Sequence, residues 1–119
     1  MVHGVVNRHG EPVVSLQLVL RHGLRAFPAV IDTGFNGYLS VPERIATRGG
    51  WQLLGTEDFE IATGQSVAQR VYLGDVIFDR SHVRVYAVAT DATDILIGTR
   101  LLARHTLTIN FRRKSVTLV

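Results

Sequence analysis

Apolar and polar residues alternate along several stretches of this chain, and the apolar positions are rich in valine, isoleucine and leucine. A period of two with many β-branched side chains predicts strands that bury one face. Turn-forming triplets such as Arg21-His22-Gly23 separate these stretches, and Gly74-Asp75 is predicted to end one of them. The clearest predicted strands cover residues 13–20, 26–31, 66–73 and 82–88. The pattern predicts an all-β fold class, with short strands in a small closed barrel.

Two short helices are predicted where the alternation stops. The first covers residues 42–48, with Pro42 in its first turn and Gly49-Gly50 after its end. The second covers residues 99–104, with Thr99 as a candidate cap. A final hairpin is predicted from residues 106–111 and 115–119. The helices are thus minor elements beside the barrel.

Length and composition indicate a folded protein. At 119 residues the chain suits one domain, so we expect residues 1–119 to form a single domain. Apolar residues make up 46% and charged residues 19%, a balance typical of globular proteins rather than disordered tails. The net charge of +3 would allow a nucleic-acid partner, but the arginines are spread along the chain. The run Arg112-Arg113-Lys114 is therefore interpreted as a solvated turn, and no nucleic acid is expected.

Several classes of protein lack support in the sequence. No stretch approaches the 18 apolar residues of a membrane span, and no signal peptide is recognisable, so no membrane partner is expected. The chain has no cysteine, which suits a reducing compartment, and we expect the cytoplasm. The five histidines lack the spacing of metal ligands. Neither a metal nor a cofactor is expected.

Asp32 carries the clearest candidate chemistry. It follows the apolar run Ala29-Val30-Ile31 and precedes Thr33-Gly34, so a carboxylate stands where a predicted strand ends. Taken alone, Asp-Thr-Gly is more readily an Asx turn than a catalytic site. A second motif later in the chain, Asp94-Ile95-Leu96-Ile97-Gly98, leads into the second predicted helix. The two motifs together make a functional role for Asp32 the favoured interpretation.

This pair of motifs resembles the retropepsin-like aspartic peptidases, relatives of pepsin, and is most similar to their small prokaryotic members. The resemblance extends from Ala26 to Phe111. It implies that Asp32 is the catalytic acid and that Thr33 and Gly34 support the catalytic loop. It also implies a second strand that contains Ile97 and Gly98 and passes beside this loop. A glycine there would let the two segments approach closely.

The resemblance also implies a mobile flap over the substrate. The residues of its tip would be Ala62, Thr63, Gly64 and Gln65. An ordinary surface hairpin is the alternative. Phe35 and Tyr38 could line specificity pockets, although core packing is favoured for both, as it is for Trp51.

Hydrolysis of an amide by two carboxylates needs one ionised and one protonated group. The chain contains a single Asp-Thr-Gly, so the second carboxylate would come from a second copy of the chain. The leading hypothesis is a homodimeric aspartic endopeptidase that acts on extended peptides or proteins. A catalytically weak or inactive binding module with the same fold is the second hypothesis. An unrelated small barrel that binds nucleic acid through its arginines is the third.

Overall fold

The computed structural model describes all residues, 1–119, and is an all-β structure with two short helices. The helices are α1 (Glu43–Arg48) and α2 (Thr99–Leu102), and neither has the length or apolar character to cross a bilayer. The strands are β1 (Val2–Val6), β2 (Pro12–Leu20), β3 (Gly23–Ile31), β4 (Leu39–Pro42), β5 (Gln52–Glu60), β6 (Ser66–Phe78), β7 (Ser81–Thr90), β8 (Ile95–Ile97), β9 (Leu107–Asn110) and β10 (Ser115–Leu118).

Six strands close into a barrel in the order β6-β7-β4-β8-β3-β2, because β6 also pairs with β2. Alternate residues of β2 point inward, and Leu16 and Leu18 are fully buried. Val76 from β6 and Ile97 from β8 are buried in the same core. This alternation is the reason why a period of two in the sequence predicts buried strands. The predicted all-β fold with a small closed barrel is confirmed.

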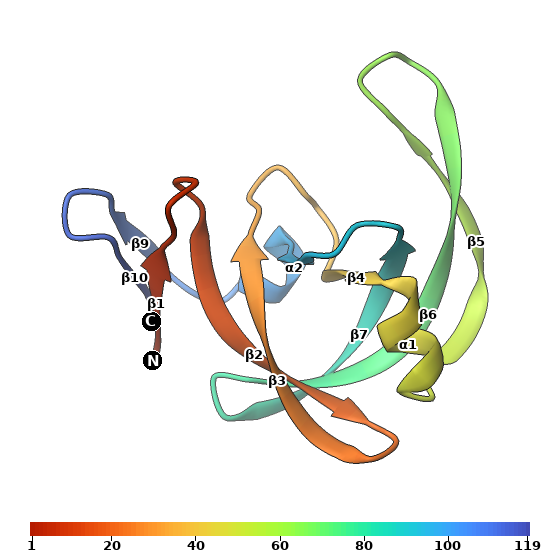
Figure 1. The fold of residues 1–119 in the computed structure, drawn as a ribbon, viewed down its shortest axis with the longest axis horizontal. Coiled ribbons are helices and arrows are strands. Elements are labelled where there is room, and N and C mark those ends of the chain that lie inside the picture. Colours follow the sequence, from red (N-terminus) through yellow and green to blue (C-terminus); the bar gives the residue numbers. More distant parts are fainter.

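Two regions extend beyond the barrel. The sheet continues past β2 through β1, β10 and β9, which brings the two chain ends together, with Val2 opposite Leu118 (Figure 1). On the other side, β5 pairs with β6 alone. The hairpin of these two strands projects from the barrel (Figure 1), and most of its residues from 52 to 70 are exposed.

The prediction of a turn at Gly74-Asp75 was wrong. Strand β6 continues to Phe78, and the turn lies at Asp79 and Arg80, which both adopt positive φ. The glycine serves packing instead, because a Cβ at Gly74 would clash with the indole ring of Trp51. The Trp51 indole N–H donates to the carbonyl of Val19 at 2.9 Å, so packing against the barrel, as expected for this residue, is confirmed.

The helix boundaries also differ slightly from the predictions. Pro42 ends β4 and precedes α1 as its N-cap. Gly98, rather than Thr99, is the N-cap of α2, and Thr99 is the first residue inside the helix. A glycine has no side chain that could cap the helix, and the first N–H groups of α2, those of Thr99 and Arg100, donate instead to the carbonyls of Phe35 and Gly37.

Candidate active site

The loop between β3 and β4, residues 32–38, passes over the end of β8. Strand β8 lies between these two strands, parallel to β3 and antiparallel to β4. Four backbone hydrogen bonds join the loop to the end of β8 and the start of α2. They run from Asp32 N to Ile97 O, from Gly98 N to Tyr38 O, from Thr99 N to Phe35 O and from Arg100 N to Gly37 O, at 2.9–3.2 Å. The loop that carries Asp32 is therefore fixed by the strand that the sequence motif places beside it.

The side chain of Asp32 is oriented within this loop. Its Oδ1 accepts a hydrogen bond from the backbone N–H of Gly34 at 2.9 Å, and its backbone carbonyl accepts one from Phe35 N–H at 3.1 Å. Asp32 is half-buried, whereas Thr33 and Gly34 are exposed at the tip of the loop. The carboxylate is thus held at a surface that a second chain could reach.

Gly98 has a specific steric role. A Cβ built at this position would clash with the carbonyl oxygen of Gly37 and would lie 2.8 Å from the Phe35 ring. Backbone atoms cannot move aside as a flexible side chain can, so only glycine fits where β8 leaves the barrel. The close approach expected from the sequence is therefore a feature of the structure.

A cavity of about 720 Å³ lies between the catalytic-loop candidate and the projecting hairpin. The loop contributes residues 34–38, and half of the 12 lining residues are apolar or aromatic. Tyr38 and Tyr86 face each other with ring centroids 6.3 Å apart, and the Arg100 guanidinium lies 5.9 Å from the centroid of Tyr38. A volume of this size, with apolar and polar groups on its walls, is large enough for a small molecule or a peptide side chain.

Phe35 and Tyr38 are both half-buried and line the cavity. The preference for core packing is confirmed for Tyr38, which packs against the core, and is wrong for Phe35, which is not among the residues packed there. Sequence reasoning missed further lining residues, namely Glu57, Phe59, Glu60, Val71, Tyr86, Val88 and Arg100. Tyr86 was recognisable in principle, because it is an aromatic residue on the outward face of an alternating strand.

The predicted flap residues lie at the tip of the β5–β6 hairpin. Residues 61–65 form the connection, with hydrogen bonds from Ile61 N to Gln65 O and from Gly64 N to Ile61 O, both at 2.9 Å. Gly64 has φ +83°, a conformation that favours glycine. Ala62, Thr63, Gly64 and Gln65 are exposed and do not line the cavity, whose wall on this side comes from β5 and from Val71 of β6. The hairpin therefore stands open in this structure.

A polar cluster connects the hairpin to α1. Arg70 on β6 donates to both carboxylate oxygens of Glu43 at 2.9 and 3.0 Å, and the Tyr72 hydroxyl donates to the same carboxylate at 3.2 Å. Hydrogen bonding to Glu43 raises the pKa of Arg70, while burial and then the Glu43 charge raise the pKa of Tyr72. The cluster holds β6 at the point where the hairpin leaves the barrel.

The chain shows no group of three or more His, Asp or Glu side chains that could hold a metal ion. The groups that stand around the cavity are carboxylates, aromatic rings, one guanidinium and backbone amides. The carboxylates that line the cavity are those of Glu57 and Glu60, whereas Asp32 lies in the adjacent loop and does not line it.

Comparison with solved structures identifies the class of fold. The chain is similar to a retropepsin-like aspartic protease from Rickettsia conorii, with a TM-score of 0.69 and 17% identity over 98% of this chain and 87% of the other. It is also similar to the retroviral protease-like domain of Ddi1 from Leishmania major, with a TM-score of 0.51 and 18% identity over 89% and 87% of the two chains. The protein has a retropepsin-like fold. No family model and no curated protein matches the sequence.

Proposed function

We propose that two copies of this chain form an aspartic endopeptidase in which residues 1–119 act as the peptidase domain. The observation that carries the proposal is the position of Asp32, a half-buried residue whose carboxylate accepts a hydrogen bond from Gly34, at the exposed tip of a loop that lines the 720 Å³ cavity. The retropepsin-like fold supports it, because one of the solved structures with a similar fold is a retropepsin-like aspartic protease. The chain has one Asp-Thr-Gly, so the second carboxylate is Asp32 of the second copy.

The two Asp32 carboxyl groups would share one proton, because two carboxylates about 3 Å apart do not both ionise. The ionised group takes a proton from water as the water oxygen bonds to the peptide carbonyl carbon. The protonated group donates a hydrogen bond to the carbonyl oxygen. A proton then passes to the amide nitrogen as the C–N bond breaks, which releases an acid and an amine.

The other site residues act through position in this proposal. Thr33 would donate a hydrogen bond across the dimer axis, and Gly34 would orient the carboxylate. Ile97 and Gly98 would hold the loop of residues 32–38 in place through their backbone hydrogen bonds to Asp32 and Tyr38. The hairpin tip at residues 62–65 would close over an extended peptide and add strand-like hydrogen bonds.

The lining of the cavity supports a preference for apolar or aromatic side chains next to the cleaved bond. Tyr38, Phe59 and Tyr86 present rings to this space, and an aromatic substrate side chain would bury apolar area against them. The substrate class is thus an unfolded or extended segment of protein with bulky apolar residues.

The test is cleavage of a mixed peptide library by a preparation whose dimeric state has been established by analytical ultracentrifugation. Asp32→Asn keeps the size of the side chain but removes the ionisable group, and we expect at least a ~10³-fold loss of kcat/KM. Cleavage is expected to be blocked by a statine-type inhibitor, which mimics the tetrahedral intermediate. A verified dimer that cleaves no peptide in the library would overturn the proposal and favour a binding module with the same fold.

A further inference from the structure

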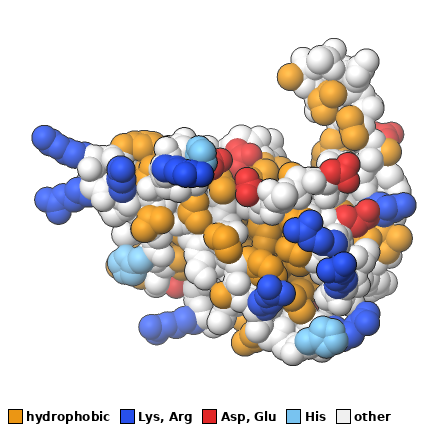
Figure 2. Space-filling view, in the orientation of Figure 1, with side chains coloured by type: hydrophobic (Ala, Val, Ile, Leu, Met, Phe, Trp, Pro, Cys, Tyr) orange, Lys and Arg blue, Asp and Glu red, His pale blue; other side chains and the backbone are white.

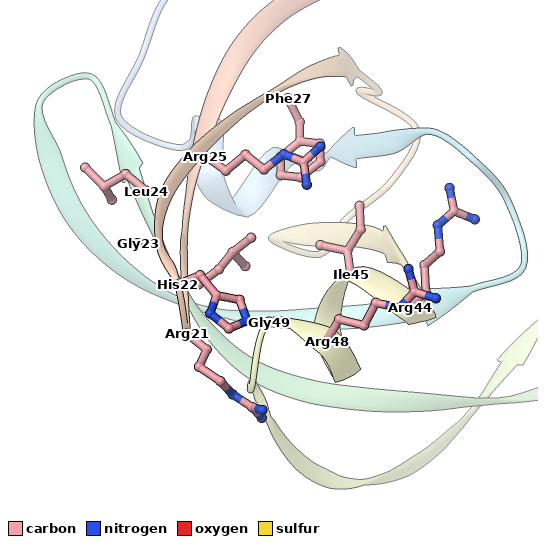
Figure 3. Close-up of a pocket in the computed structure, with 11 residues that line it drawn as sticks. Arg21, His22, Gly23, Leu24, Arg25, Phe27, Arg44, Ile45, Arg48 and Gly49 are labelled. Carbon is pink, nitrogen blue, oxygen red and sulfur yellow. The ribbon is translucent and has the colours of Figure 1, made fainter.

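A second cavity, of about 770 Å³, lies at the end of the barrel opposite Asp32. Its walls come from the β2–β3 turn, the first half of β3 and helix α1 (Figure 3). Strand β3 begins at this cavity with Gly23 and ends at Ile31, next to Asp32. The cavity is therefore separate from the candidate active site and is not used by the proposed reaction.

The side chains around this cavity are strongly basic. Arg21 and His22 come from the turn, Arg25 from β3, and Arg44 and Arg48 from α1 (Figure 3). Four of the 13 Lys and Arg residues of the chain thus line one cavity, and no Asp or Glu lines it. On the surface, basic side chains gather around an apolar patch near α1 and the β2–β3 turn (Figure 2).

The charges of these four arginines are not neutralised within the chain. Ion pairs in the structure involve Arg70, Arg84, His82, His105 and the N-terminal amine, but none of the four. Glu43, the one carboxylate of α1, is already bound by Arg70 and Tyr72. Four cations in one cavity repel each other, and a bound anion would remove that repulsion.

The two walls are held together before any ligand binds. The backbone N–H of Arg21 donates to the carbonyl of Gly49 at 2.8 Å, which joins the β2–β3 turn to the end of α1. The guanidinium of Arg25 lies over the Phe27 ring, 4.9 Å from its centroid. Because these groups are already held in place, they lose less conformational entropy when a ligand binds.

Apolar side chains form the rest of the lining. Leu20, Phe27 and Ile45 are partly buried and pack against the core, while Leu24 is 59% exposed. The cavity therefore offers cations for negative groups and an apolar surface for a hydrophobic or aromatic body. A volume of this size suits a small molecule, and the concave shape does not suit a nucleic-acid duplex.

We propose that this cavity binds a small organic polyphosphate, with its phosphates on Arg25, Arg44 and Arg48 and an aromatic or apolar body against Phe27 and Ile45, which lie on the same side of β3 (Figure 3). Guanidinium groups bind phosphate oxygens in a two-pronged geometry and stay charged at every physiological pH. A nucleoside polyphosphate has both required parts. Binding at this site would stabilise the folded state by mass action.

The proposal is tested by calorimetric titration of the full chain with ATP as the probe. The double variant Arg44→Gln/Arg48→Gln removes two guanidinium groups from exposed positions of α1, and we expect ATP to bind at least ~10-fold more weakly. The matched control, Arg112→Gln/Arg113→Gln, removes the same charge from the distant β9–β10 turn. We expect it to weaken binding less than about twofold, since exposed charges at that distance are screened.

Further measurements test the proposal even if the replacement of Arg44 and Arg48 disturbs helix α1. Arg25→Gln changes another wall of the cavity and should also weaken ATP binding, while circular dichroism checks that each variant is folded. Inorganic tripolyphosphate should bind more weakly than ATP, because it lacks the apolar body. Peptide cleavage should be the same in the Arg44→Gln/Arg48→Gln variant and the parent chain.

Three outcomes would overturn the proposal. ATP could show no binding, or the control variant could lose as much affinity as the cavity variant, which would indicate a general charge effect. Tripolyphosphate could bind as tightly as ATP, which would exclude recognition of an organic body. A duplex oligonucleotide that binds more tightly than ATP and displaces it would instead indicate a nucleic-acid surface.

Discussion

The two cavities of this protein have nearly the same volume, about 720 and 770 Å³, but differ in charge and in how their walls are held. The cavity beside Asp32 has Glu57, Glu60 and Arg100 on its walls, whereas the other has four arginines and no carboxylate. One wall of the first is a projecting hairpin, while the walls of the second are joined by the Arg21–Gly49 hydrogen bond. In the two proposals, the first cavity takes an extended chain under the hairpin and the second takes a compact anion.

This contrast implies that the two ends of the barrel can be damaged separately. Strand β3 reaches both ends of the barrel, but it has different neighbours at each. Its last residues, before Asp32, pair with β8. Its first residues, up to Arg25, line the arginine cavity together with the β2–β3 turn and α1. Variants at one end should therefore leave the function of the other intact. The following predictions use peptide cleavage and ATP binding as the two readouts.

The largest effect is expected from Gly98→Ala, which places a methyl group against the Gly37 carbonyl. We expect a loss of about 3 kcal/mol in the free energy of unfolding, because an overpacked backbone contact cannot relax cheaply. Cleavage should fall by about 10²-fold, since a displaced loop misplaces Asp32. Urea denaturation and kcat/KM measure the two losses, and ATP binding to the folded fraction should be unchanged.

Gly10→Ala is the control for this prediction. Gly10 lies in the β1–β2 turn at φ +79°, and an alanine methyl group there would meet no other atom within 4 Å, so only backbone strain is added. We expect it to cost about 1 kcal/mol and to leave cleavage unchanged. If Gly98→Ala were as stable and active as the parent chain, the crossing of β8 and the loop would not require a glycine.

The barrel could be predicted from the sequence because it depends on a local pattern. Alternation in residues 13–20 and 82–88 reports which face of a strand is buried. The crossing at Asp32 was predicted differently, because only the resemblance to retropepsin-like peptidases implied that the segment with Gly98 lies beside the Asp32 loop. Gly74 shows the limit of such patterns. A glycine in a sequence can indicate either a turn or a close packing contact. At Gly74 it is a contact, because the Trp51 ring fills the space that a side chain would take, and Trp51 is distant in sequence.

The arginine cavity could not be predicted for the same reason. Arg21 and Arg25 belong to one hairpin and Arg44 and Arg48 to a helix, so along the chain they look dispersed. Their meeting depends on how the β2–β3 turn packs against the end of α1, which no period of two or 3.6 encodes. The arginines are spread along the chain, as the sequence shows, but these four line one cavity in the fold.

A smaller effect is expected from Tyr86→Ala at the cleft. Tyr86 is 55% exposed, so its removal should hardly change stability, yet it removes an aromatic wall from the cavity. For peptides with an aromatic residue next to the cleaved bond we expect about a 10-fold loss of kcat/KM, equivalent to one buried ring contact. Tyr86→Phe keeps the ring and should retain activity. Equal losses for glycine-containing and aromatic peptides would argue against a role in specificity.

The smallest effect is expected from Glu60→Gln, which removes one exposed charge near the end of β5. In the proposed complex this carboxylate faces the substrate. Peptides whose lysine side chain would lie next to the hairpin should lose about two- to threefold in kcat/KM, which is the effect expected when one solvent-exposed ion pair is lost. Matched peptides with a glutamine at that position should be unaffected, and the difference should vanish at high salt. ATP binding should not change, since Glu60 does not line the arginine cavity. A change of similar size in ATP binding would mean that the two ends of the barrel share one electrostatic field.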